Sequence, residues 1–97
     1  LAAVLFSGKT EAEVEALATR VALALRADGT PAGVEVLGPA PQALARLRGQ
    51  HRWHLLLQAT HAARVREAAG LALEIAEAAR GPRTVRVVAD VDPVEVL

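Results

Sequence analysis

The chain has 97 residues, of which 53% are hydrophobic and 2% aromatic, and its formal net charge is zero. This length fits one domain over residues 1–97, and the absence of Cys excludes disulfides and thiolate metal ligands. No apolar run reaches the roughly 18 residues of a membrane span, so we expect no membrane partner. Met is absent even at position 1, which leads us to expect a piece of a larger protein.

The start of the chain predicts a strand followed by a helix. The short apolar run at 2–6 indicates a buried strand. Thr10 and Glu13 have the spacing of a capping box, which marks a helix start. Apolar residues then recur every three or four positions, as on one face of a helix, until Asp28-Gly29 ends the pattern.

The middle of the chain predicts strands. Residues 34–37 alternate as a second strand does, and prolines within 38–41 end it, because proline cannot donate to a strand ladder. The stretches 44–48 and 51–58 flank Gly49-Gln50, which predicts a β-hairpin with a two-residue, glycine-first turn. Alternation divides the second hairpin strand into one face with Trp53, Leu55 and Leu57 and another with Arg52, His54 and Leu56.

A second helix and a last strand complete the pattern. Thr60 is placed to cap a helix over 61–80 that Gly81-Pro82 ends, and 85–88 reads as a strand before a turn at 90–93. The order is that of an α+β, split β-α-β fold of the ferredoxin-like kind. We therefore expect an antiparallel-dominated sheet with two helices on one face and a β-hairpin insertion.

Charge is distributed unevenly, since the segment from Leu37 to Arg66 contains no acidic residue. Arginine binds phosphate bidentately, and an aromatic ring can stack on a base. The hairpin combines both kinds of residue, and we predict that it contacts nucleic acid through Arg46, Arg48, His51, Arg52 and Trp53. The alternative is an ordinary arginine-rich surface with Trp53 in the core.

Catalytic and metal sites are not indicated. His51 and His54 are three apart on a strand and point to opposite faces, which disfavours a shared metal. The stretch 7–10 reads Ser-Gly-Lys-Thr, but a phosphate loop needs an earlier glycine where Ala3 stands. The acidic pair Asp90 and Asp92 fits a turn better than general acid/base catalysis. We expect no catalytic residue, no metal and no cofactor.

Three ordered motifs resemble a known family. They are Val-Leu-Gly-Pro-Ala-Pro at 36–41, Leu-Arg-Gly-Gln-His-Arg-Trp-His-Leu-Leu-Leu-Gln at 47–58 and Asp-Val-Asp-Pro-Val at 90–94. In this order and spacing they closely resemble the C-terminal domain of the PriA family, the bacterial replication-restart DNA helicases also called primosomal protein N′.

The resemblance implies an S10-like fold and a DNA- and protein-binding accessory domain of a cytoplasmic, nucleoid-associated helicase. The ATPase motifs lie upstream in the family, so we expect this part not to be an enzyme. The implied partners are single-stranded or branched DNA, the other domains of the helicase, and the acidic C-terminal tail of single-stranded DNA-binding protein. The resemblance implies that an arginine at the start of the second helix, Arg64 or Arg66, receives the carboxylate of that tail.

Two other interpretations remain open from the sequence. The chain is either a protein-docking module without direct DNA contact, whose basic face meets only acidic peptides, or a small acyl- or phosphate-processing enzyme on a ferredoxin-like fold. The enzyme interpretation lacks a convincing nucleophile or base, because Ser7 is the only serine.

Overall fold

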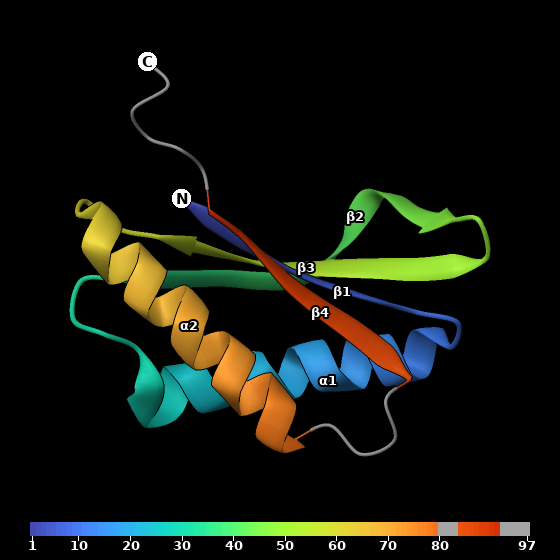
Figure 1. Ribbon diagram of the computed structural model, residues 1–97, viewed down its shortest axis with the longest axis horizontal. Coiled ribbons are helices and arrows are strands. Elements are labelled where there is room, and N and C mark those ends of the chain that lie inside the picture. The colour runs from blue at the N-terminus through green and yellow to red at the C-terminus, as the bar shows by residue number, and fades with distance from the viewer. Residues whose placement is uncertain (80–83, 92–97) are drawn as a thin grey trace.

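The computed structural model describes residues 1–79 and 84–91, with the backbone alone at 28–29 and 43–47. The first helix ends at Ala24, and a π-helical turn (Leu25–Gly29) follows it without a break. The elements in chain order are β1 (Ala2–Gly8), α1 (Glu11–Ala24), β2 (Glu35–Leu47), β3 (Gln50–Gln58), α2 (Ala62–Ala79) and β4 (Val85–Val91). Figure 1 shows the sheet and the two helices as separate layers. The expected α+β class is confirmed.

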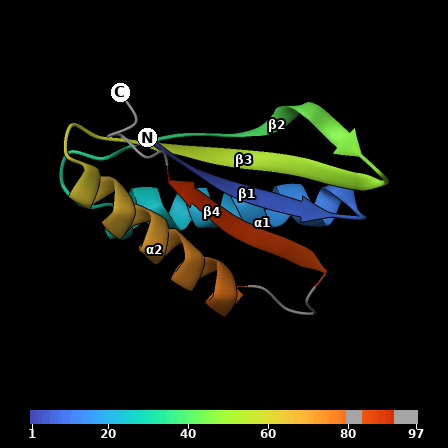
Figure 2. The same cartoon turned by 45° about the horizontal axis from the view of Figure 1, so that its top comes forward.

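The sheet has the strand order β2-β3-β1-β4, and all neighbouring strands are antiparallel. α1 connects β1 to β2 past the intervening β3, and α2 connects β3 to β4 past β1. These are the two split β-α-β units that the sequence predicted. Both helices lie on the same side of the sheet and contact each other (Figure 2).

The core lies between the sheet and the helices. Its largest fully buried side chains are Phe6, Leu25, Leu55, Leu57, Val4, Val14, Val21 and Val65. Alanines on the inner faces of both helices are also buried, and their small side chains let the helices approach the sheet and each other closely. β1 alternates strictly between buried and half-buried residues. Its buried residues face the helices, and its half-buried residues lie on the face of the sheet that the helices do not cover.

β2 is one long strand, where the sequence predicted two. The two prolines interrupt the ladder only locally, because Pro39 lies in a bulge and Pro41 still pairs with Trp53. One register shift lies between Leu37 and Ala40, where Gly38 has φ +103° and the Gly38–Pro39 peptide bond is cis. A second shift spans residues 42–45. The predicted hairpin is present, but its first strand is the outer half of β2.

The hairpin turn is formed by Arg48 and Gly49, one residue earlier than the glycine-first turn that the sequence predicted. Leu47 pairs with Gln50 across it. Both turn residues have positive φ, +54° and +78°, which is the requirement of a type I′ turn. Such a turn matches the twist of the two strands, and this match outweighs the cost of a left-handed arginine.

The helix caps differ from the sequence prediction. The Thr10 carbonyl accepts hydrogen bonds from the amides of Glu13 and Val14, both at 3.1 Å, but the Thr10 hydroxyl forms no capping bond. The predicted capping box is therefore wrong. In α2 the His61 carbonyl, not Thr60, begins the helix by accepting from the Arg64 amide at 3.0 Å. The stop predicted at Gly81-Pro82 lies outside the described residues. The turn predicted at 90–93 is wrong in its first half, because Asp90 and Val91 pair with β1 as the end of β4, and its second half lies outside the described residues.

Candidate functional site

The sheet face turned away from the helices brings two arginines into one cross-strand row. Arg52 on β3 pairs with Ser7 on β1, and Ser7 pairs with Arg86 on β4. Because neighbouring strands lie about 4.8 Å apart, the two arginine Cα atoms are roughly 10 Å apart. We call Arg52, Ser7 and Arg86 the arginine row.

Strand alternation fixes this arrangement. Val85 and Val87 turn toward the helices, which leaves Arg86 exposed on the other face. Arg52 has the same position on β3, between Trp53 and His51 on the inner side. Opposite Arg52, β2 bulges away over residues 42–45 and provides no paired residue. The backbone of Arg52 thus lies beside a gap in the ladder.

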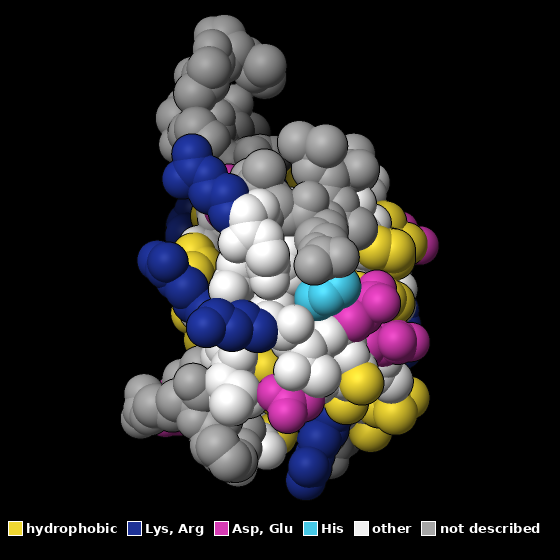
Figure 3. Space-filling view, turned by 90° about the vertical axis from the view of Figure 1, so that its right-hand side faces the viewer, with side chains coloured by type: hydrophobic (Ala, Val, Ile, Leu, Met, Phe, Trp, Pro, Cys, Tyr) yellow, Lys and Arg dark blue, Asp and Glu magenta, His cyan; other side chains and the backbone are white. Residues whose placement is uncertain are grey.

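Two further cations lie at the same end of the molecule. Lys9 directly follows β1, and Arg48 stands in the hairpin turn, and both are exposed. Figure 3 looks at this end and shows most of the visible Lys and Arg side chains along one side, with most Asp and Glu side chains away from them. Among the described residues, none of Lys9, Arg48, Arg52 and Arg86 forms an ion pair. We call these four residues the basic end.

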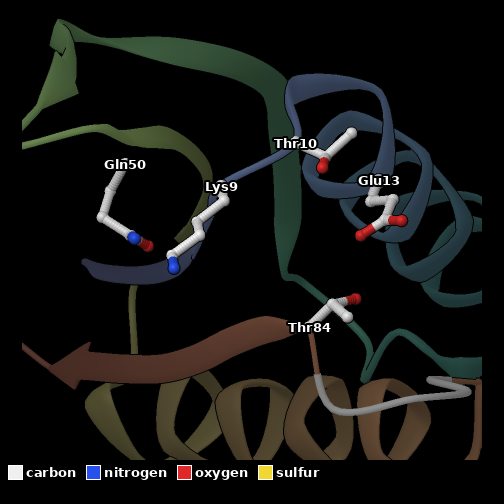
Figure 4. A pocket seen from close by; sticks show the side chains of 5 residues that line it. All are labelled: Lys9, Thr10, Glu13, Gln50 and Thr84. Carbon is white, nitrogen blue, oxygen red and sulfur yellow. The ribbon is translucent and has the colours of Figure 1, made fainter.

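A polar hollow adjoins the basic end. It has a volume of about 430 Å³ and is lined by Lys9, Thr10, Glu13, Gln50 and Thr84. Figure 4 shows Lys9 and Gln50 on one wall, the first turn of α1 on another and Thr84 below. The hollow offers one cation, one carboxylate and three neutral polar groups. This mixed lining favours water or a small polar group over a concentrated negative charge.

The five hairpin residues predicted to contact nucleic acid do not lie together. Arg52 and Arg48 belong to the basic end. His51 and Trp53 alternate with Arg52 and turn toward the helix side, where Trp53 is half-buried and packs against the core. Its Nε1 has no acceptor among the described residues. The backbone of Arg46 pairs with His51.

Sequence reasoning missed Lys9 and Arg86. Both lie outside the acid-free segment on which the prediction rested. The signal for Arg86 was present in the alternation Val-Arg-Val, which places the arginine opposite the buried valines. It was not enough by itself, because only the strand order reveals that β1 joins β4 to β3.

The start of α2 lies at the opposite end of the molecule from the hairpin turn (Figure 1). Arg64 and Arg66 are both exposed there. The Arg64 guanidinium lies 3.2 Å from the Glu67 carboxylate, and more than half of each side chain is exposed. The acid-free segment therefore supplies two separate basic surfaces.

Other functional classes find little support in the described residues. No group of three or more His, Cys, Asp or Glu side chains there is arranged to hold a metal ion. None of the described helices is long and apolar enough to cross a membrane. Gly8 of the Ser-Gly-Lys-Thr stretch has a packing role, because a Cβ added to it would lie 2.7 Å from the Thr84 carbonyl oxygen.

Comparison with known proteins identifies the family. No curated protein sequence matches the chain significantly. The family model described as "Primosomal protein N C-terminal domain" matches residues 1–94, nearly the whole chain. The match includes both split β-α-β units, the arginine row and the start of α2. The chain therefore belongs to the family of primosomal protein N (PriA) C-terminal domains.

Proposed function

We propose that this primosome accessory domain binds DNA through its basic end and an acidic protein tail at the start of α2. Its family supports a role in replication restart. The domain acts by binding, and the ATP-dependent helicase chemistry belongs to the rest of the parent protein. Its partners in this proposal are single-stranded or branched DNA and the C-terminal tail of single-stranded DNA-binding protein.

The arginine row carries the DNA proposal. Neither Arg52 nor Arg86 has an acidic partner among the described residues, so both guanidinium groups are available for phosphate. Lys9 and Arg48 extend the positive charge at the same end. Phe6 is fully buried and Trp53 turns toward the core, which leaves no aromatic ring on the open face of the described sheet. Binding should therefore depend on backbone phosphates, with little sequence preference.

Fluorescence anisotropy with labelled single-stranded and forked DNA tests this proposal. Affinity should fall steeply between about 50 and 200 mM salt. Replacing both Arg52 and Arg86 by Ala should lower the slope of log affinity against log salt by about 1.4 on single strands. Arg20→Ala on α1 is the matched control, since it removes one exposed arginine distant from the row. Binding that ignores salt, or an equal loss in the control, would contradict the proposal.

The start of α2 supports the second part of the proposal. Arg64 and Arg66 are exposed there, and a guanidinium suits a terminal carboxylate. An acidic peptide ending in Asp-Ile-Pro-Phe should bind, and the same peptide with an amidated C-terminus should bind more weakly. Arg64→Ala and Arg66→Ala, tested singly, identify the receiving residue. If the peptide binds and DNA does not, the domain is a protein-docking module only.

A further inference from the structure

The open face of the sheet carries an apolar area beside the arginine row. Leu5 pairs with His54 and Val88, and Leu56 pairs with Ala3 and Leu37. Paired residues turn to the same face, so these leucines and Val88 all point away from the helices. None of them belongs to the core or packs against it. We call Leu5, Leu37, Leu56 and Val88 the apolar patch.

Much of the apolar patch is open to solvent. Val88 is 40% exposed and Leu37 is 37% exposed, while Leu5 and Leu56 on the two central strands are half-buried by their neighbours. In the described part of the chain, both helices lie on the other side of the sheet (Figure 2). A contiguous apolar area of this kind on a sheet is typical of an interaction surface.

Acidic residues flank the patch at the end away from the arginine row. Asp90 on β4 pairs with Ala3 on β1, and Glu35 on β2 pairs with Gln58 on β3. Both carboxylates are exposed, and neither forms an ion pair with a described residue. The charge on the open face therefore changes sign along the strands, from two arginines to two carboxylates, with His54 and the apolar side chains between them.

The dimensions of the face favour a single helix as its occupant. Four strands at about 4.8 Å spacing span roughly 14 Å, which is close to the 10–12 Å diameter of one helix with its side chains. A stable dimer buries about 800 Å² of accessible surface on each partner, whereas seven-residue strands at about 3.3 Å per residue make this face roughly 14 by 23 Å in projection. A second copy of the chain therefore does not fit the area as well as a helix does.

We propose that the apolar patch docks an amphipathic helix of a partner protein, with lysine or arginine beside its apolar stripe. The stripe covers Leu5, Leu56 and Val88, and the basic side chains meet Asp90 and Glu35. The arginine row repels such a helix and fixes its position on the acidic half of the face. The docked helix completes a three-layer arrangement with the sheet in the middle. This surface is separate from the proposed contacts with DNA phosphates.

Two matched peptides test the docking. Each has about 14 residues, roughly four helical turns, and the same leucine stripe, flanked by Lys in one and Glu in the other. The Lys peptide should bind the full 97-residue chain at least about tenfold more tightly than the Glu peptide. Amide shifts in an NMR titration should map to β1, β3 and β4.

Variants separate this site from other surfaces. Leu56→Gln should lower the affinity for the Lys peptide about tenfold. Leu23→Gln, which changes an exposed leucine of α1, should leave that affinity unchanged. Val88→Thr keeps the shape of the side chain and provides a second variant if Leu56→Gln impairs folding. Asp90→Asn should reduce the preference for Lys over Glu.

Four results would overturn the docking proposal. They are equal binding of both peptides, amide shifts confined to α1 and α2, self-association through Leu56 in sedimentation without peptide, and loss of DNA binding in Leu56→Gln. Arg52→Ala should leave the Lys peptide bound, so a failure of the DNA proposal and a failure of this one give different results.

Discussion

Arg52 and Arg86 lie on either side of Ser7 in one row across three strands, although they are far apart in the sequence. If both hold phosphate, single alanine variants at the two positions should weaken single-stranded DNA binding to a similar degree. Each should lower the salt slope by about 0.7. Arg86→Lys should keep the slope and still lose affinity, because lysine keeps the charge without the bidentate fork. Anisotropy across a salt series measures both the affinity and its salt slope. If Arg86→Ala changed neither, β4 would not be part of the DNA interface.

Glu67 competes with any carboxylate that approaches Arg64. Their ion pair is exposed and three residues apart on α2, where such pairs are worth about 0.3–0.5 kcal/mol. Glu67→Gln should therefore raise the affinity for an acidic-tail peptide about twofold. Isothermal titration calorimetry of the free-acid and amidated peptides checks this. An unchanged affinity in Glu67→Gln, together with a loss in Arg66→Ala, would assign the carboxylate to Arg66.

Gly8 and Gly70 should respond oppositely to alanine. A Cβ at Gly8 meets the Thr84 carbonyl oxygen at 2.7 Å and the Val14 side chain at 3.1 Å, whereas Gly70 has open space around it on α2. Gly8→Ala should lower the free energy of unfolding by about 1–3 kcal/mol through overpacking. Gly70→Ala should raise it by up to about 1 kcal/mol through helix propensity. Urea denaturation of both variants measures the contrast, and a stable Gly8→Ala would mean that β4 shifts at little cost.

Arg26 links the end of the first helix to β2. Its guanidinium donates to the carbonyls of Val36 at 2.9 Å and Gly38 at 2.7 Å. Arg26→Ala should lower the free energy of unfolding by about 1 kcal/mol, since these bonds are exposed. Arg26→Lys should recover only part of this loss, because an ammonium group lacks the planar fork that reaches two carbonyls. Thermal unfolding of the three proteins provides the test.

Trp53 offers a test of which hairpin face meets DNA. Its ring packs on the helix side of the sheet, away from Arg52. Trp53→Phe should lower the free energy of unfolding by about 1–3 kcal/mol, since it removes packed atoms from a partly buried site. DNA affinity should stay within about twofold of the original. A large loss of DNA affinity in a folded variant would instead support base stacking by Trp53.

Much of the fold was predictable because local patterns and topology agree. β3 follows the alternation read from the sequence, and Leu55 and Leu57, which it placed on one face, are both buried. The errors lie where a β-bulge lets a strand continue past residues that normally end one. The prolines at 39 and 41 were expected to end a strand, and a bulge with Gly38 at positive φ continues it.

The candidate site was less accessible to sequence reasoning. A charge count along the chain groups residues that are near in sequence, and so it joined the hairpin to Arg64, which lies at the other end of the molecule. It also omitted Arg86, which only the order β3-β1-β4 brings beside Arg52. Strand alternation predicts which face a residue occupies, but not which distant strand becomes its neighbour.

The carbonyls that Arg26 occupies have a consequence for how the protein behaves at high concentration. β2 is an edge strand, and edges with free carbonyls and amides are templates for aggregation. Here Val36 and Gly38 already accept from Arg26, and Pro39 and Pro41 have no amide hydrogen to donate. An incoming strand therefore finds few partners along this edge. A single arginine thus links the stability of the fold to its solubility, and its loss should be visible first as turbidity on storage.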